Sequence, residues 1–228
     1  MLKAVIFDFN GIILDDEPLH FAAMRKGAAS LGIDLQKEVY WERYLPLADR
    51  ECLEAICRDH SIDPSQAEFS NALAVKSRTY HRLLQDRAPL FAGAAEFIKA
   101  AAQYPLAIAS GARRQEIEST LESTGLRRYF VLILAAEDFV QGKPHPESFL
   151  LTLERLNRKV GSGFIQPGEC LVVEDSVAGV NGAKSAGMIC LAVTNSYPRQ
   201  LLQAADRVVA SLAEVQFNSL QTLFEESV

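Results

Sequence analysis

Short apolar runs alternate along this chain with longer stretches of helical periodicity, and this alternation limits the fold more than any other feature. The runs are apolar throughout instead of alternating with polar residues, as in strands buried on both faces of a parallel sheet. We therefore predict an α/β fold with a Rossmann-like parallel sheet and right-handed crossovers. The expected strands are residues 4–7, 106–109, 131–134, 170–173, 189–193 and 207–209, and the expected helices between them are 92–103, 113–123, 146–157 and 177–186.

Residues 16–87 interrupt this alternation, because no strand-like run occurs among them. Their apolar residues instead follow helical spacing, and we expect helices at 18–31, 37–44, 50–60 and 64–84. The interruption follows directly on the first strand. It predicts an all-helical domain at 16–87, inserted into a core made of residues 1–15 and 88–228.

Composition and charge narrow the possible partners of the chain. Its 228 residues carry a formal net charge of -6, which does not favour binding to the phosphates of nucleic acid. No apolar run reaches the ~18 residues that suggest a membrane helix, and no signal peptide is evident. The four cysteines show no C-x-x-C spacing, which favours a reducing compartment. We expect a cytoplasmic protein without nucleic-acid, membrane or obligate protein partners.

Polar side chains follow the ends of four predicted strands. Asp8 follows the first strand and Ser110 the second, while Lys143 lies in the loop after the third. Glu174 and Asp175 follow the fourth. Ligands of open parallel sheets bind beyond the carboxyl ends of the strands. Carboxylate oxygens are the ligands that Mg²⁺ prefers, and lysine and hydroxyl groups bind phosphate. This edge of the sheet is thus predicted to hold a divalent cation and a phosphate group.

Four motifs at these strand ends give the chain a resemblance to the haloacid dehalogenase-like superfamily. Within it, the chain is most similar to the β-phosphoglucomutase and sugar-phosphatase group, which has a helical cap. Each motif is weak alone, but four in order at strand ends are specific, and the resemblance covers nearly the whole chain. The motifs are Asp8-Phe9-Asn10-Gly11, Ala109-Ser110-Gly111, Gly142-Lys143-Pro144-His145-Pro146, and Val173-Glu174-Asp175-Ser176 followed by Ala178-Gly179.

The resemblance implies a phosphoryl-transfer enzyme with a nucleophilic aspartate. Asp8 would attack phosphorus and form an aspartyl-phosphate intermediate. The phosphoryl oxygens would be bound by Ser110, Gly111 and Lys143. Ser110 and Lys143 would also stabilise charge in the transition state. The substrate would be a small phosphorylated metabolite, and the helical insertion would be the cap that closes over the site.

The resemblance also implies a Mg²⁺ cofactor. Its ligands would be Asp8, the backbone carbonyl of Asn10 and Asp175, with Glu174 acting directly or through a bound water.

Three residues of the predicted cap are further candidates for substrate binding. His20 occupies a position that contacts the acid/base residue in relatives of β-phosphoglucomutase, although it is equally a histidine on a helix face. Arg50 resembles the cap arginine that meets a distal phosphate of the substrate. Lys76 is a weaker candidate.

Asn10 departs from the family pattern, in which an aspartate at this position protonates the leaving group and then activates the second nucleophile. An amide cannot transfer a proton, and general acid/base catalysis typically contributes ~10²- to 10⁴-fold. Three explanations of Asn10 are open. It is the natural residue of an enzyme that uses a good leaving group or another acid, it is the natural residue of a weakened or non-catalytic relative, or it is an introduced change. We expect a Mg²⁺-dependent phosphatase of sugar-phosphate type. The alternatives are a hexose-phosphate mutase and a catalytically impaired relative that binds a phosphometabolite.

Overall fold

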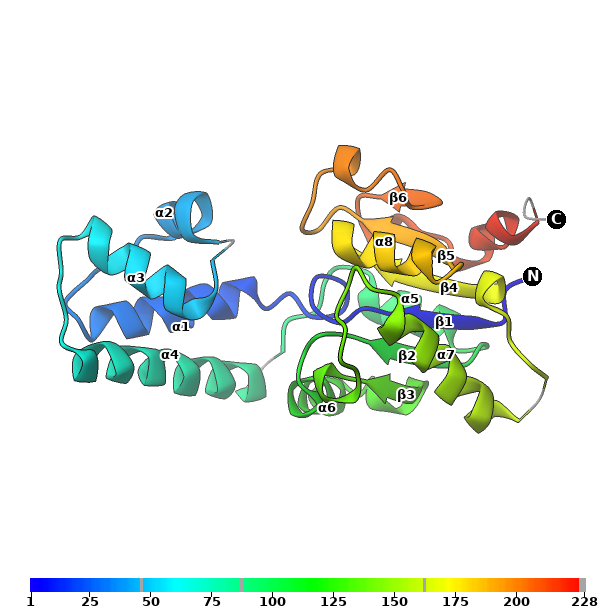
Figure 1. Ribbon diagram of the computed structural model, residues 1–228, viewed down its shortest axis with the longest axis horizontal. Helices are drawn as coiled ribbons and strands as arrows, with labels where there is room; N and C mark the ends of the chain where they lie inside the picture. Colours follow the sequence, from blue (N-terminus) through cyan, green and yellow to red (C-terminus); the bar gives the residue numbers. More distant parts are fainter. Residues whose placement is uncertain (46, 87, 162, 226–228) are drawn as a thin grey trace. The chain divides into compact units, whose positions relative to one another are not determined.

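The computed structural model describes residues 1–45, 47–86, 88–161 and 163–225, and it confirms the predicted α/β fold. Six parallel strands form one sheet in the order β3-β2-β1-β4-β5-β6, so β1 lies between the two halves of the sheet (Figure 1). The chain builds β2 and β3 on one side of β1 and then crosses to the other side. The strands are β1 Ala4–Phe7, β2 Leu106–Ala109, β3 Phe130–Leu134, β4 Cys170–Glu174, β5 Ile189–Val193 and β6 Arg207–Val209.

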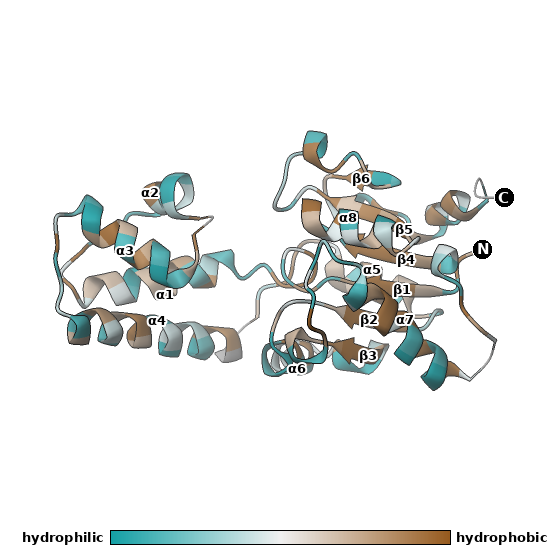
Figure 2. Cartoon of the chain, viewed as in Figure 1, coloured by the Kyte–Doolittle hydropathy of each residue, from teal (hydrophilic) through white to brown (hydrophobic). Residues whose placement is uncertain are grey.

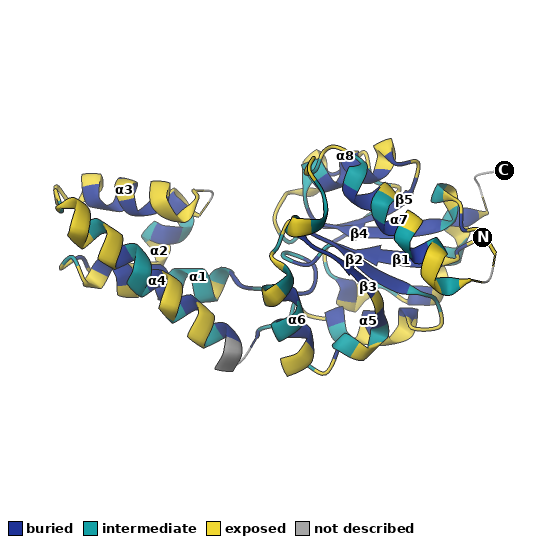
Figure 3. Cartoon of the chain, turned by 60° about the horizontal axis from the view of Figure 1, so that its bottom comes forward, coloured by how far each residue is buried: buried dark blue, intermediate teal, exposed yellow. Residues whose placement is uncertain are grey.

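Helices cover the sheet, and its inner strands are buried along their whole length (Figure 3). Alternate residues of a strand point to opposite faces. Ile6 packs in one cluster with Phe149 and Val180 of two covering helices, whereas Phe7 packs edge-to-face on Phe97. Figure 2 shows the resulting concentration of hydrophobic residues in the strands. The helices of this part are α5 Ala94–Ala101, α6 Arg114–Ser123, α7 Glu147–Val160 and α8 Val177–Ser185.

Short 3₁₀ segments complete the connections between these elements. They are η2 Arg127–Tyr129, η3 Ala136–Asp138, η4 Pro167–Glu169, η5 Arg199–Leu201, η6 Leu212–Glu214 and η7 Phe217–Phe224. The last of them contributes Phe217, whose ring packs on Phe97 of α5 with a centroid distance of 5.2 Å. The end of the described chain thereby helps to cover one face of the sheet.

The chain divides into two compact units, one formed by Met1–Asp15 with Pro89–Val228 and the other by Asp16–Ala88. We call them the sheet unit and the helical unit. The helical unit has its own apolar core, in which Met24, Leu53 and Ile56 are buried. Its elements are α1 Glu17–Ala29, α2 Lys37–Val39, the π-helical segment η1 Tyr40–Tyr44, α3 Asp49–Asp59 and α4 Gln66–Asp86.

The helix predicted at 37–44 is instead a short α-helix, α2, that continues as the wider π-helical segment η1. The Leu45 N–H donates to the Tyr40 carbonyl, five residues earlier. Both Tyr40 and Tyr44 are buried, and their hydroxyls donate to Glu17 and Asp59. These partners come from α1 and α3, which the local periodicity cannot indicate.

Helix α4 begins two residues after the predicted start at residue 64. The Ser65 hydroxyl accepts from the Glu68 N–H at 3.3 Å, and the Glu68 carboxylate accepts from the Ser65 N–H at 2.9 Å. This reciprocal capping box satisfies donors at the helix end and sets the start of α4.

The four cysteines are buried free thiols. Burial raises the pKa of the Cys52 and Cys170 thiols to about 12, so both behave as small core residues. Among the residues that the structure describes, no helix has the length and apolar character needed to cross a membrane.

Candidate active site

Two neighbouring strands bring three carboxyl groups together. Phe7 of β1 pairs with Val173 of β4, and the Asp8 N–H continues this ladder by donating to the Val173 carbonyl at 2.9 Å. Asp8 therefore lies beside Glu174 and Asp175, at the carboxyl end of the sheet. Each of the three side chains offers an oxygen that lies within 4.8 Å of the other two.

Lys143 contacts two of these carboxylates. Its Nζ lies 2.9 Å from Asp8 Oδ1 and 2.5 Å from Glu174 Oε1. It also lies 5.2 Å from the centroid of the ring of Phe149 in α7, which is a cation–π contact. Burial alone would lower the pKa of Lys143, but the Asp8 and Glu174 carboxylates raise it well above its usual range. The ammonium group therefore stays charged at neutral pH.

Glu174 is fully buried, and both of its carboxylate oxygens have donors. Oε1 accepts from Lys143, while Oε2 accepts from the backbone N–H groups of Asp175 and Ser176 at 3.0 and 3.1 Å. A Cβ atom at Gly179 would lie 1.9 Å from the Glu174 carboxylate carbon, so this turn of α8 requires glycine. These contacts hold the Glu174 carboxylate in one position and direct it at Lys143.

Asp175 is also buried, but its carboxylate has fewer hydrogen-bond donors than that of Glu174. Its pKa is raised to about 7, chiefly by burial and also by the Asp8 and Glu174 carboxylates, while a hydrogen bond from Ser196 opposes the shift. Burial and the Asp8 carboxylate also raise the pKa of Glu174. Three carboxyl groups thus share the single positive charge of Lys143, and an additional cation would favour their ionised forms.

The donor set fits a hard divalent cation. Asp8 Oδ1 is buried and forms an ion pair with the Lys143 ammonium group at 2.9 Å. Asp175 directs carboxylate oxygen into the same cluster. Oxygen ligands from one or two carboxylates are the usual protein contribution to a Mg²⁺ site. The predicted ligands Asp8, Asp175 and Asn10 all belong to the sheet unit.

The loop after β1 passes very close to Asp175. Gly11 has a φ of +76°, a conformation that favours glycine, and a Cβ atom there would lie 2.0 Å from Asp175 Oδ2. The sharp turn that follows Asp8 therefore depends on the absence of a side chain at Gly11. It places the backbone of Asn10 and Gly11 beside the carboxylate cluster.

Ser110 lies at the end of β2, the other neighbour of β1. Its N–H donates to the Leu134 carbonyl at 3.1 Å, and its hydroxyl accepts from the Ala112 N–H at 3.2 Å. The serine is buried, and Gly111 beside it is exposed with open space around its Cα. The serine hydroxyl can still donate its own proton, as phosphate binding requires.

Sequence reasoning missed two residues at this edge of the sheet, Asn195 and Ser196. The Ser196 hydroxyl donates to Asp175 Oδ2, and Asn195 Nδ2 donates to the Gly11 carbonyl at 2.6 Å. Both follow the end of β5, so the strand-end rule that found the other site residues could have included them.

Comparison with known proteins identifies the family. A family model of haloacid dehalogenase-like hydrolases matches residues 2–187. This chain belongs to the haloacid dehalogenase-like hydrolase family. The resemblance predicted from the four motifs is therefore confirmed.

Relatives of this hydrolase have names that refer to phosphorylated sugars. A phosphorylated carbohydrates phosphatase of Thermotoga maritima is 34% identical over 188 residues, 82% of each chain. A beta-phosphoglucomutase of Bacillus subtilis is 27% identical, over 99% of this chain and 95% of the relative. The crystal structure of an Asp-to-Asn variant of CbbY from Rhodobacter sphaeroides, in complex with xylulose-1,5-bisphosphate, superposes with a TM-score of 0.69. It is 28% identical and covers 94% of this chain and 96% of CbbY.

Two other predicted residues of the hydrolase, His20 and Lys76, contact each other within the helical unit. Lys76, 3% exposed, donates to Asp49 Oδ2 at 2.7 Å and to His20 Nδ1 at 2.9 Å. Because an ammonium group only donates, His20 Nδ1 must accept, and Nε2 carries the hydrogen. Nε2 then donates to Asp16 Oδ2 at 3.2 Å, which also accepts from the Tyr80 hydroxyl at 2.8 Å.

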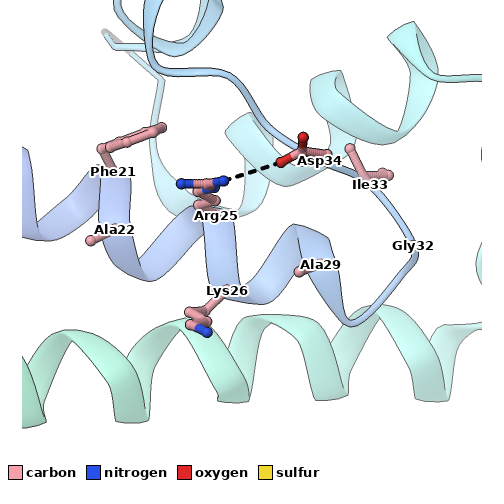
Figure 4. Close-up of a pocket in the computed structure, with 8 residues that line it drawn as sticks. All are labelled: Phe21, Ala22, Arg25, Lys26, Ala29, Gly32, Ile33 and Asp34. Carbon is pink, nitrogen blue, oxygen red and sulfur yellow. Dashed lines mark hydrogen bonds and ion pairs between the residues drawn. The ribbon is translucent and has the colours of Figure 1, made fainter.

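Arg50, the remaining candidate, lies elsewhere in the helical unit. Its guanidinium group is 3.3 Å from Glu54 and 5.2 Å from the centroid of the Phe69 ring. It lines a cavity of about 600 Å³ together with Arg58. A second cavity, of about 620 Å³, is lined by α1 and the loop after it and contains none of the predicted site residues (Figure 4).

Proposed function

We propose that this hydrolase is a Mg²⁺-dependent phosphatase that acts on a small phosphorylated metabolite of sugar-phosphate type. The observation that carries the proposal is the contact of Lys143 with both Asp8 and Glu174 at the carboxyl edge of the sheet, with Asp175 beside them. One cation that faces several carboxylates suits a site for a metal and a phosphate dianion. The names of the relatives support the same substrate class.

In this proposal Asp8 is the nucleophile. Its carboxylate attacks phosphorus, a bond forms between Asp8 and the phosphoryl group, and the bond to the leaving oxygen breaks, with solvent water supplying the proton that this oxygen takes up. Water then attacks the aspartyl phosphate and gives its proton to solvent, which releases phosphate and restores the carboxylate. Lys143, held by Glu174, reduces repulsion between Asp8 and the incoming anion. The Ser110 hydroxyl and the backbone at Gly111 bind phosphoryl oxygens.

The cation would be held by Asp8, by the backbone carbonyl of Asn10 and by Asp175. When bound, Mg²⁺ supplies positive charge that polarises the phosphoryl group and favours ionised carboxylates. We assign Glu174 to the positioning of Lys143 instead of direct ligation, because both of its oxygens already accept hydrogen bonds.

The helical unit would serve as the cap that selects the substrate. Arg50, His20 and Lys76 are our candidates for substrate binding, and a hydrogen bond between Lys76 Nζ and His20 Nδ1 joins two of them.

Asn10 favours a second candidate function, a catalytically impaired relative that binds a phosphometabolite. The amide cannot protonate a sugar alkoxide or activate water. The CbbY variant with asparagine in place of an aspartate was captured with a sugar bisphosphate, which supports ligand binding by a site of this type. A hexose-phosphate mutase remains the alternative, in keeping with the name of the Bacillus subtilis relative.

The deciding experiment compares p-nitrophenyl phosphate with a panel of sugar phosphates, each with and without Mg²⁺. An aryl phosphate has a good leaving group and needs little protonation. We expect Mg²⁺-dependent cleavage of the aryl phosphate by the unaltered chain and its loss in Asp8→Asn, a variant of nearly the same shape. Asn10→Asp should raise the rate with sugar phosphates by ~10²-fold or more. If neither the chain nor Asn10→Asp hydrolyses any phosphate ester, the phosphatase proposal fails and the binding role is favoured.

A further inference from the structure

The loop that follows β5 contacts the carboxylate cluster at one point and the loop after β1 at another. Ser196 donates its hydroxyl hydrogen to Asp175 Oδ2, and Asn195 donates from Nδ2 to the Gly11 carbonyl at 2.6 Å. We call Thr194, Asn195 and Ser196 the β5 loop. It lies beyond residue 187, where the match to the family model ends, so family membership assigns it no role.

The β5 loop is itself anchored to the sheet. The Thr194 N–H donates to the Val209 carbonyl of β6 at 3.0 Å, which continues the ladder between β5 and β6. Asn195 is half-buried and Ser196 is exposed, and the hydrogen bonds that they make are partly buried. Both side chains are short, so holding their acceptors costs little conformational entropy.

The hydroxyl of Ser196 restricts the Asp175 carboxylate. A carboxylate that accepts a hydrogen bond on Oδ2 keeps Oδ1 available, and rotation about its last bond is opposed by the loss of that hydrogen bond. Gly11 packs so closely on the same oxygen that a Cβ atom would lie 2.0 Å from it. Asp175 Oδ2 thus contacts both Ser196 and the backbone of the loop after β1.

Asn195 acts on that backbone directly. Its amide fixes the Gly11 carbonyl, and Gly11 follows the residue whose carbonyl is a proposed cation ligand, Asn10. The β5 loop therefore holds two of the proposed ligand groups, one through a side chain and one through the backbone. Partners of this kind orient metal ligands, and their removal typically weakens metal binding.

We propose that Ser196 and Asn195 are positioning residues of the cation site, with Ser196 setting the orientation of Asp175 and Asn195 setting the loop that carries Asn10. This inference rests on the proposed function, because it concerns the same cation. Neither residue touches the reacting atoms in this proposal.

The test is direct titration of Mg²⁺ into the metal-free full-length chain by calorimetry, with circular dichroism to verify folding. We expect Ser196→Ala to raise the Kd for Mg²⁺ by about 10- to 100-fold. Asn195→Ala should raise it less, because it acts through the backbone. Ser196→Thr retains the hydroxyl and should stay close to the unaltered chain. Tyr197→Phe removes an exposed neighbouring hydroxyl and should change nothing.

The outcomes separate the two proposals. If the unaltered chain binds Mg²⁺ and Asp175→Ala does not, the site exists; equal affinity in Ser196→Ala then overturns the positioning role alone. If Ser196→Thr weakens Mg²⁺ binding as much as Ser196→Ala does, the positioning role is also overturned, because the hydroxyl is then not responsible for the effect. If the unaltered chain binds no Mg²⁺, the proposed function fails and this inference fails with it.

Discussion

Removal of the Lys143 charge should be among the most destabilising changes in the sheet unit. Glu174 has no exposed side-chain surface, and its Oε1 lies 2.5 Å from Lys143 Nζ. Lys143→Met keeps most of the apolar stem but leaves a buried carboxylate unpaired. Breaking a buried pair from one side costs about 3–5 kcal/mol, because the remaining charge is neither solvated nor compensated. We expect the free energy of unfolding to fall by that amount at pH 7.5 in the presence of EDTA.

The second half of the experiment also removes the negative charge of Glu174, which Lys143→Met leaves unpaired. The double change Lys143→Met with Glu174→Gln should recover most of the loss, since no unpaired charge remains at Oε1. Lys184→Met is the matched control, because Lys184 pairs with Asp206 at 2.6 Å but its side chain is 36% exposed. Exposed pairs contribute about 0–1 kcal/mol.

The assay is urea unfolding followed by circular dichroism, which reports on both units. Tryptophan fluorescence is less suitable, because the chain's single tryptophan, Trp41, belongs to the helical unit. A second series at pH 5 should show a smaller loss for Lys143→Met, because an unpaired Glu174 with a raised pKa takes up a proton there. If Lys143→Met destabilises no more than Lys184→Met, the reasoning from buried charge is refuted.

Three other predictions follow from the same site. The pKa of Asp175 is raised, chiefly by burial, from its ordinary value of 3.8 to about 7, so between these pH values the native state keeps a proton that the unfolded chain has lost. The free energy of unfolding of the metal-free protein should therefore decrease as the pH rises from about 4 to about 7. Asp175→Asn should make the free energy of unfolding, measured by urea titration, depend less on pH over this range. Gly179→Ala places a Cβ atom 1.9 Å from the Glu174 carboxylate carbon and should cost about 1–3 kcal/mol in the same assay, whereas Gly142→Ala, with no atom within 4 Å of the new Cβ, should be nearly neutral. Rapid mixing with p-nitrophenyl phosphate should show a burst of nitrophenolate, because Asn10 slows hydrolysis of the aspartyl phosphate more than its formation; a linear time course would argue against that intermediate.

The strands of this protein could be predicted from the sequence because each inner strand is buried on both faces. Such a strand is a contiguous apolar run, and the runs at 4–7 and 189–193 coincide with β1 and β5. The strand-end rule then located the candidate site, because parallel strands direct their carboxyl ends to one edge. Asp8 and Lys143 were found in this way, and the structure brings them into contact.

Contacts between distant segments required the tertiary structure. Tyr40 and Tyr44 contact other helices along a π-helical segment that the helical periodicity of 37–44 does not reveal. Lys76 meets His20 across 56 positions, and Asn195 meets Gly11 across 184. A local pattern records which residues are buried, but it does not record which distant donor satisfies which acceptor.

The sequence by itself thus determined the class of fold, the family and the strand ends at which chemistry is expected. Only the tertiary structure decided that both oxygens of Glu174 are already engaged and that Ser196 is bonded to Asp175. The physical reason is that strand and helix periodicity depend on residues close together in the sequence. The partners of a buried polar group depend instead on how the whole chain packs.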